Sequence, residues 1–272
     1  IRTALVKVGW NQTEDGWTYR NEDGSYISGG WRAIDGSWYY FDAEGYRTEG
    51  WKAIGGTWYY FDKATGIMAE NGFYDIDGAT YYFKAGGAMA ISWQVIDGAD
   101  YFFTGSGAMA KNQWSGSYYL GEDGKMLTNA WAGVYHVGAN GIYQNGWLKL
   151  DEGWYYLGTN GVLQFGWFQV GNTWYFGDTD PDEGSVGIIL ESTLVEIDGV
   201  TYFFKEGGAM AIGWVLLDGA YSYFNGSGAM VTSAWVGNYY LNEDGVMARN
   251  EWVDGGRYYV GDDGLWIPNA QK

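Results

Sequence analysis

The feature that most limits how this chain can fold is a repeat of about 20 residues. The stretch GGWRAIDGSWYYFDAEGYRTE (residues 29–49) is followed by GWKAIGGTWYYFDKATGIM (50–68), which aligns Trp31 with Trp51 and Trp38 with Trp58. A fixed period of this length is typical of a solenoid, in which each unit buries its apolar face only against its neighbours. The repeat therefore predicts an array of similar units.

A single unit has the pattern of a β-hairpin. Residues 31–34 form a short alternating run, Asp35-Gly36 is a strong two-residue turn signal, and residues 38–41 form an aromatic strand. The register that follows from this turn pairs Ile34 with Ser37, Ala33 with Trp38 and Trp31 with Tyr40.

Such a hairpin has two aromatic faces, because side chains alternate along a strand. One face carries Trp31, Ala33, Trp38 and Tyr40, and the other carries Ile34, Tyr39 and Phe41. An isolated hairpin is marginal in water. Stacking would turn one face into a shared core and leave some aromatic rings at the junctions between units.

The whole chain is accordingly predicted to be all-β, a single solenoid of stacked β-hairpins over residues 1–272. Helix-forming residues do not recur at helical spacing, and the chain contains no cysteine that could form a disulfide. The expected parts are regular repeats over 1–167, a lengthened repeat over about 168–206, regular repeats over 207–265 and a C-terminal cap over 266–272. In the lengthened repeat we expect an acidic loop followed by an apolar strand over residues 186–190.

The net charge of −18 restricts the partners of the protein. A chain this acidic repels nucleic acid and anionic lipid, and we expect neither nucleic-acid binding nor membrane insertion. The sequence begins at Ile1 in a strand-like stretch, without a signal segment or a run long enough to cross a bilayer. We interpret it as a piece of a longer protein.

Catalytic residues and cofactors are not expected. Histidine occurs once, as His136, where other units place Tyr or Phe, so we interpret it as a packing residue. Catalysis would need acid, base or nucleophile groups fixed in one pocket. The recurring aspartates instead occupy turn positions: Asp35, Asp77, Asp97, Asp198 and Asp218.

One acidic stretch resembles the start of a calcium loop, with Asp178, Asp180 and Asp182 at alternate positions. The glycine of the motif comes one residue late, at Gly184, and the twelfth position is Ile189 instead of Glu. We therefore expect a solvated acidic loop and no metal site, with calcium binding as the alternative.

The paired tryptophans are the strongest candidates for a binding site. Trp31 and Trp38, with Tyr60 from the following unit, could form three walls of an open cage. Each ring face attracts a cation by roughly 0.5–2 kcal/mol, so such cages favour quaternary ammonium groups. The same rings could stack on sugars, or all of them could simply fill the core.

These residues resemble the choline-binding, or cell-wall-binding, repeats of secreted bacterial surface proteins and autolysins, through Gly-Trp, then Trp-Tyr-Tyr, then Gly-x-Met in each unit. The resemblance extends over essentially the whole chain. It implies a left-handed hairpin solenoid attached to another module and located at the bacterial cell wall. It also implies that choline or phosphocholine on wall teichoic acid is held between consecutive hairpins by two Trp, one Tyr and often a Met.

Carried over to this sequence, the resemblance implies two principal cages and several further candidates. The principal cages are Trp31, Trp38 and Tyr60, and Trp51, Trp58 and Tyr82 with Met68 close to the second. The further pairs are Trp10 with Trp17, Trp147 with Trp154, Trp167 with Trp174, and Trp214 with Tyr221. In other units the second Trp is replaced by Thr80, Asp100, Ser117, Val134, Thr201, Asn238 or Arg257.

Beyond Phe73 the units are also similar to the glycan-binding repeats of glucan-synthesising enzymes and clostridial toxins. That similarity implies a sugar site near Trp174, Tyr202 and Trp214. Three hypotheses follow: a non-catalytic module for choline-bearing wall polymer, a module for glucan or host glycan, and a structural stalk or adhesin whose aromatic residues are all internal.

Overall fold

The computed structural model describes residues 7–180 and 184–272, and within these ranges the chain consists of strands and turns without a helix. Consecutive strands pair as antiparallel hairpins. No helix in the described ranges is long and apolar enough to cross a membrane. The strands of the first half are β1 (Gly9–Gln12), β2 (Trp17–Arg20), β3 (Gly30–Ile34), β4 (Ser37–Phe41), β5 (Gly50–Ile54), β6 (Thr57–Phe61), β7 (Gly72–Ile76), β8 (Ala79–Phe83), β9 (Ser92–Ile96), β10 (Ala99–Phe103), β11 (Gln113–Ser115), β12 (Tyr118–Leu120) and β13 (Ala130–Ala132).

The second half continues the same pattern. Its strands are β14 (Tyr135–Val137), β15 (Gly146–Lys149), β16 (Trp154–Leu157), β17 (Gly166–Val170), β18 (Thr173–Gly177), β19 (Thr193–Ile197), β20 (Val200–Phe204), β21 (Gly213–Leu217), β22 (Ala220–Phe224), β23 (Ala234–Val236), β24 (Tyr239–Leu241), β25 (Glu251–Val253), β26 (Tyr258–Val260) and β27 (Trp266–Ile267). The predicted all-β fold of stacked hairpins is confirmed.

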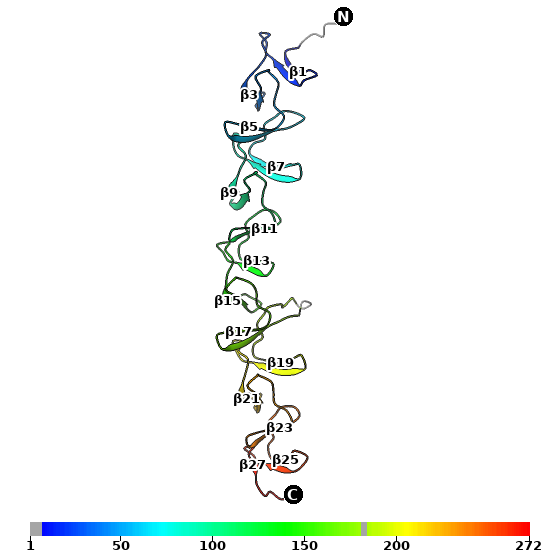
Figure 1. Ribbon diagram of the computed structural model, residues 1–272, viewed down its shortest axis with the longest axis vertical. Coiled ribbons are helices and arrows are strands. Elements are labelled where there is room, and N and C mark those ends of the chain that lie inside the picture. Colours follow the sequence, from blue (N-terminus) through cyan, green and yellow to red (C-terminus); the bar gives the residue numbers. More distant parts are fainter. Residues whose placement is uncertain (1–6, 181–183) are drawn as a thin grey trace. The chain divides into compact units, whose positions relative to one another are not determined.

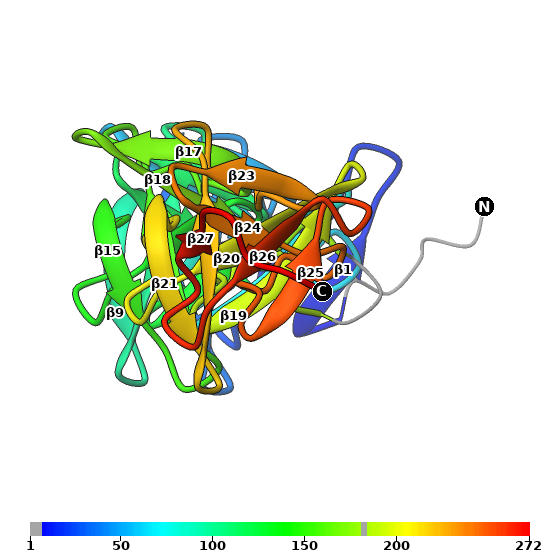
Figure 2. The same ribbon diagram turned by 90° about the horizontal axis from the view of Figure 1, so that it is seen from below.

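The chain divides into two compact units, and the division falls at β13 and β14. The first unit comprises residues 1–132 and 137–142, and the second comprises 133–136 and 143–272. Each unit is a stack of hairpins that follow one another in chain order (Figure 1). Within the second unit, Figure 2 shows β15, β17 and β19 on different sides of the stack. That the two units form one continuous solenoid stays a prediction.

The Asp-Gly turns explain the tight hairpins. Asp35 and Gly36 have φ angles of 50° and 81°, and Asp77 and Gly78 have 50° and 87°. Two consecutive residues with positive φ define the type I′ turn, whose twist matches that of the flanking strands. The interpretation of the recurring aspartates as turn residues is therefore confirmed at these positions.

The predicted register of β3 and β4 is also confirmed, with Trp31 opposite Tyr40 and Ala33 opposite Trp38. The two faces have different environments. Ile34, Tyr39 and Phe41 are buried, whereas 42% of the Trp38 surface is exposed. The face of Phe41 thus forms the core, and the opposite, open face leaves Trp38 partly exposed to solvent while Trp31 and Tyr40 are partly buried.

The last residue of the second strand forms the centre of the core in most hairpins. This residue is fully buried as Phe41, Phe61, Phe83, Phe103, Leu120, Val137, Leu157, Phe204, Phe224, Leu241 and Val260. A large apolar side chain at the same place in successive hairpins lets each unit bury its core face against the next unit, as a repeat array requires.

Backbone hydrogen bonds connect successive hairpins: a residue in the segment after one hairpin donates to the second strand of the hairpin before it. The amide of Met68, in the segment that follows β6, donates to the carbonyl of Trp38 in β4 at 2.9 Å. Met89 and Trp58 repeat this bond at 2.9 Å, and Met210 and Trp174 repeat it at 2.9 Å in the second unit. Each of these three methionines is thereby fixed beside a tryptophan of the preceding hairpin.

The stretch between Trp167 and Trp214 differs in part from expectation. The hairpins β17–β18 and β19–β20 have ordinary length, so the extra residues belong to the connection between them, residues 178–192. The apolar strand predicted over residues 186–190 is wrong, because these residues form a turn and a single bridge from Ile189 to Gly177. Ile189 occupies the place that methionine has in other repeats. Its apolar side chain is therefore explained by packing at that single position, and the apolar run does not indicate a strand.

At the C-terminal end, β27 adds a third strand to the hairpin β25–β26. Trp266 and Ile267 of this strand are 42% and 44% exposed. The segment predicted as a cap therefore extends the last sheet at its edge.

Candidate functional site

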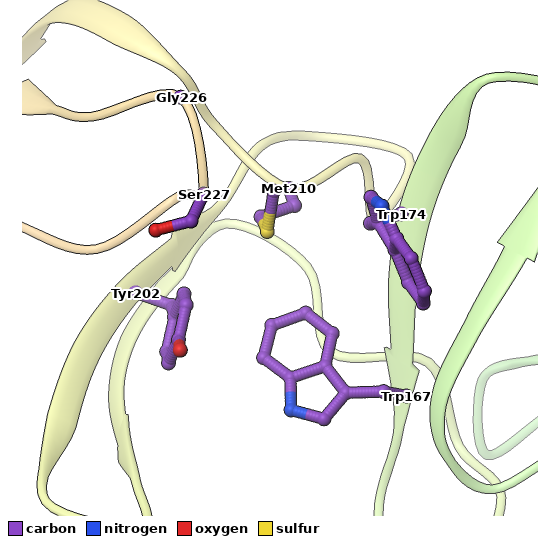
Figure 3. Close-up of a pocket in the computed structure, with 6 residues that line it drawn as sticks. All are labelled: Trp167, Trp174, Tyr202, Met210, Gly226 and Ser227. Carbon is purple, nitrogen blue, oxygen red and sulfur yellow. The ribbon is translucent and has the colours of Figure 1, made fainter.

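Aromatic hollows open between successive hairpins in both units. In the second unit, Trp167, Trp174, Tyr202, Met210, Gly226 and Ser227 line a hollow of about 310 Å³. Figure 3 shows the rings of Trp174 and Tyr202 on opposite sides of it, with Met210 between them and Trp167 completing the wall. The two indoles come from β17 and β18, and the tyrosine comes from β20 of the next hairpin.

The rings of this hollow meet edge to face. The centroids of Trp167 and Trp174 are 6.4 Å apart with planes at 82°, and those of Trp167 and Tyr202 are 4.8 Å apart at 67°. Perpendicular contacts are favourable between aromatic quadrupoles and leave ring faces free to meet a third group.

The first unit contains two hollows of the same design. One, of about 390 Å³, is lined by Trp31, Trp38, Tyr59, Met68 and Gly86. The other, of about 430 Å³, is lined by Trp51, Trp58, Tyr81, Met89, Gly105 and Ser106. The distances between the first Trp and the Tyr of the next hairpin are 4.9 Å for Trp31 and Tyr59 and 4.7 Å for Trp51 and Tyr81.

A fourth hollow, of about 290 Å³ in the second unit, replaces the second tryptophan by tyrosine and adds charged groups. Its lining residues are Trp214, Tyr221, Tyr239, Met247, Arg249 and Asp263. Arg249 and Asp263 are both exposed, which places one cationic and one anionic group at the edge of an aromatic site.

The structure corrects the predicted third wall. Tyr59 and Tyr81 line the two hollows of the first unit, and the predicted Tyr60 and Tyr82 do not. Tyr60 instead packs on its cross-strand partner Trp51 at 5.2 Å, and Tyr82 packs on Phe73 at 5.0 Å.

Head-to-tail stacking explains this correction. The core face of one hairpin covers part of the open face of the hairpin before it, so Trp31 contacts Tyr59 and Phe61, which share the core face of β6. The prediction assumed that both hairpins offer the same face to the site. Since neighbouring residues on a strand point to opposite faces, that assumption shifted the choice by one residue.

The methionine is also reassigned. From the sequence, Met68 is predicted to lie close to the pair Trp51 and Trp58. In the structure Met68 lines the hollow of Trp31 and Trp38, and Met89 lines the hollow of Trp51 and Trp58. The hydrogen bond from the Met68 amide to the Trp38 carbonyl accounts for this position. Of the sugar-site residues named from the sequence, Trp174 and Tyr202 share one hollow and Trp214 belongs to another.

Two predicted tryptophan pairs have a basic side chain over their rings. The guanidinium carbon of Arg47 lies 5.5 Å from the centroid of Trp10 and 5.0 Å from that of Trp17. Lys149 Nζ lies 5.4 Å from the centroid of Trp154, whose ring is 6.3 Å from that of Trp147. These distances are those of cation–π contacts, so in both units a cation of the chain lies over an indole face.

Units without a second aromatic residue have a different surface at the same register position. Thr80 stands opposite Asp75, as Trp38 stands opposite Ala33, and its hydroxyl lies 2.6 Å from an Asp75 carboxylate oxygen. Lys111 Nζ donates to the same hydroxyl at 3.1 Å. These polar groups replace one aromatic wall.

The acidic loop can be described only in part, because Asp182 lies outside the described residues. Burial raises the pKa of Asp178, but hydrogen bonds from the Ser185 hydroxyl and the Asp180 amide outweigh it and lower that pKa overall. Among the described residues, no group of three or more His, Cys, Asp or Glu side chains is arranged to hold a metal ion.

His136 has the environment of a packing residue, as predicted. It is 5% exposed, and its Nδ1 lies 2.7 Å from Gln144 Oε1.

The glycine behind each methionine fixes the depth of the hollow, which leads to a testable prediction. A Cβ added at Gly87 would stand 2.3 Å from the Met68 sulfur, so Gly87→Ala should push the thioether into the hollow of Trp31 and Trp38. Gly86→Ala is the matched control, because Gly86 has the same φ of +80° and no atom within 4 Å of such a Cβ. Both variants bear the strain of a left-handed alanine, roughly 1–2 kcal/mol.

We expect Gly87→Ala to lower the free energy of unfolding further than Gly86→Ala, by about 1–3 kcal/mol, because overpacking adds to the backbone strain. Urea unfolding of both variants measures the difference. Equal losses would mean that Met68 moves aside without cost.

Comparison with models of known protein families shows which kind of repeat these units are. Models of choline-binding repeats match residues 27–73, 71–114 and 192–235, and a second such model matches 108–143 and 229–266. A model of cell wall binding repeats matches residues 145–163 and 166–180. No curated protein sequence gives a significant match.

Solved structures show the same similarity. The modular autolysin LytC from Streptococcus pneumoniae, in complex with a synthetic peptidoglycan ligand, is 28% identical over 82% of this chain and 52% of its own, with a TM-score of 0.57. CbpJ from Streptococcus pneumoniae TIGR4 is 27% identical over 95% of this chain and 99% of its own, with a TM-score of 0.50. The chain spans about half the length of the autolysin.

Proposed function

Because this chain belongs to the choline-binding repeat family, we propose that it is a non-catalytic module that anchors a secreted bacterial protein to choline-bearing cell-wall polymer. In this proposal, the ammonium group of choline or phosphocholine on teichoic acid enters the hollows between hairpins. The attached part of the protein, which could be an enzyme as in the modular autolysin, would carry any catalytic activity.

The observation that carries the proposal is the recurrence of one aromatic arrangement at four places. Each hollow combines two aromatic residues of one hairpin with a tyrosine of the next, and a methionine lies beside them. A quaternary ammonium cannot donate hydrogen bonds, so it is recognised through ring faces and apolar contact, which these hollows provide.

The expected binding free energy is that of a weak site that occurs several times along the chain. Three ring faces at roughly 0.5–2 kcal/mol each sum to about 1.5–6 kcal/mol, which corresponds to dissociation constants from tens of millimolar to tens of micromolar. A polymer with many choline groups would engage several hollows at once, and the second contact would gain from the high effective concentration. The net charge of −18 adds a long-range attraction for the cationic group.

A titration with choline chloride tests the proposal. We expect choline to change the tryptophan fluorescence of the protein and to release it from a quaternary-amine resin, whereas sodium chloride at the same ionic strength leaves it bound. Unchanged fluorescence and no release would contradict the proposal. The same absence of response to glucan and galactosides would favour a structural stalk.

A second candidate, carbohydrate binding, is favoured by the polar groups at three hollows. Ser227 lines the hollow of Trp167 and Ser106 that of Trp51. Arg249 and Asp263 line the hollow of Trp214. Aromatic platforms beside hydrogen-bonding groups suit a sugar ring and its hydroxyls. Release from the resin by free glucan or galactosides, with no effect of choline, would support this candidate.

A further inference from the structure

The first tryptophan pair contains a cation that belongs to the chain itself. Arg47 occupies the place that methionine has in other units: it bridges to Phe41 as Met68 bridges to Phe61. Its amide donates to the Trp17 carbonyl at 2.9 Å, as the Met68 amide does to Trp38.

The glycine of the following turn shows the same equivalence. A Cβ at Gly66 would stand 2.6 Å from Arg47 Cδ, as one at Gly87 would stand 2.3 Å from the Met68 sulfur. The first part of the Arg47 side chain therefore follows the course of a methionine. Its longer end places the guanidinium carbon 5.0 Å from the Trp17 centroid and 5.5 Å from that of Trp10.

The guanidinium is held by polar partners as well as by the rings. Its Nε and Nη2 donate to Glu49 Oε1 at 3.1 and 2.9 Å. Nη1 donates to the Thr65 carbonyl and Nη2 to the Ala64 carbonyl, both at 2.8 Å. Only 6% of the side chain is exposed. A buried cation that has a carboxylate and two carbonyls as partners is costly to displace, because each partner would lose its hydrogen bond.

The tyrosine of this site is correspondingly buried. Tyr39 contacts Trp10 at a centroid distance of 4.8 Å, as Tyr59 contacts Trp31 at 4.9 Å. Tyr39 is 7% exposed, whereas Tyr59 is only partly buried beside its hollow. Burial raises the pKa of Tyr39, and the nearby positive charge of Arg47 acts against that rise.

We propose that Arg47 is an internal ligand that fills the cation site of Trp10, Trp17 and Tyr39 and closes it to choline. The proposal rests on the proposed function only in naming choline as the excluded ligand. An attached cation has a high effective concentration at the site, so a millimolar free ligand competes poorly with it. The first pair able to bind a ligand in the first unit is then Trp31 and Trp38. The pair Trp10 and Trp17 instead stabilises the contact between the hairpin β1–β2 and the segment after β4.

Two reciprocal substitutions test the proposal by the number of bound choline molecules. Arg47→Met should raise the number by one, because it restores the side chain found in the open hollows. Met68→Arg should lower it by one, since Glu70 stands two residues after Met68, as Glu49 does after Arg47, and can pair with the new guanidinium. Equilibrium dialysis with radiolabelled choline chloride counts the sites, and circular dichroism shows that each variant keeps its strands.

A folded Arg47→Met variant with an unchanged number of sites would overturn the proposal. Arg47→Met combined with Trp17→Ala should lose the additional site, and its persistence would also overturn the proposal.

A second readout needs no choline, so it separates failure of this proposal from failure of the proposed function. In the NMR spectrum of the unaltered protein, the Arg47 side-chain Nε–H and Cδ protons should be shifted upfield by the indole ring currents. They should move toward ordinary values in Trp17→Ala. Ordinary shifts for Arg47 in the unaltered protein would show that the guanidinium does not occupy the site, whatever choline does elsewhere.

Discussion

Replacing Phe61 by alanine should lower the free energy of unfolding by about 3–5 kcal/mol, the usual cost of removing a fully buried phenylalanine. Phe61 is 0% exposed. Its ring lies 5.7 Å from that of Trp31 and 6.5 Å from that of Tyr40, both in the preceding hairpin. The substitution therefore removes core surface within a hairpin and also the contact that joins two hairpins.

Trp58→Ala is the control for this prediction, because Trp58 belongs to the same strand, β6, but is 48% exposed. Its loss should cost only about 1 kcal/mol, since roughly half of the ring already meets water. Thermal and urea unfolding of both variants measure the difference. If Trp58→Ala destabilised the protein as much as Phe61→Ala, the open face of the hairpin would be part of the core.

Trp38→Ala, in contrast to Phe61→Ala, should lower the free energy of unfolding only slightly but weaken ligand binding strongly. Trp38 is 42% exposed and forms one wall of the hollow shared with Trp31 and Tyr59. Removal of one ring face should weaken choline binding at that hollow by about 2- to 30-fold, which corresponds to roughly 0.5–2 kcal/mol. Calorimetric titration with choline should show one site fewer in the tight range.

Trp266→Ala is the matched control for ligand binding. Trp266 is also 42% exposed, and it lines none of the four hollows described above. It should leave the choline titration unchanged. Equal effects of the two substitutions would mean that choline responds to exposed indoles in general and not to the hollows.

The hairpins themselves were predictable because their determinants are local. The Asp35-Gly36 turn fixes which residues face each other, and the alternation along a strand then decides which side chains share a face. The pairing of Trp31 with Tyr40 and the placement of Phe41 on the face opposite Trp38 followed from these two rules, but the burial of that face did not.

The walls of the hollows were only partly predictable because they depend on how hairpins stack. The two tryptophans of each pair lie on one hairpin, so the sequence alone was enough to predict that they share a face. The tyrosine comes from the next hairpin, and the choice between Tyr59 and Tyr60 depends on which face that hairpin turns toward its neighbour. No local pattern contains this information.

The role of Arg47 was missed although the sequence contained a signal for it. Gly45-Tyr46-Arg47 aligns with Gly66-Ile67-Met68, so an arginine visibly replaces the methionine of the motif. The alignment alone does not show that this position lies beside the tryptophans of the preceding hairpin. That follows only from the hydrogen bond between the Arg47 amide and the Trp17 carbonyl.

The most direct test of the account is a crystal structure of the protein grown with saturating choline chloride. We expect density for the quaternary ammonium in the hollow of Trp31, Trp38 and Tyr59, with its nitrogen within about 6 Å of each ring centroid. The Trp10 and Trp17 pair should still hold the Arg47 guanidinium. Hollows that contain only water at saturating choline would contradict the claim that these rings form cation-binding sites.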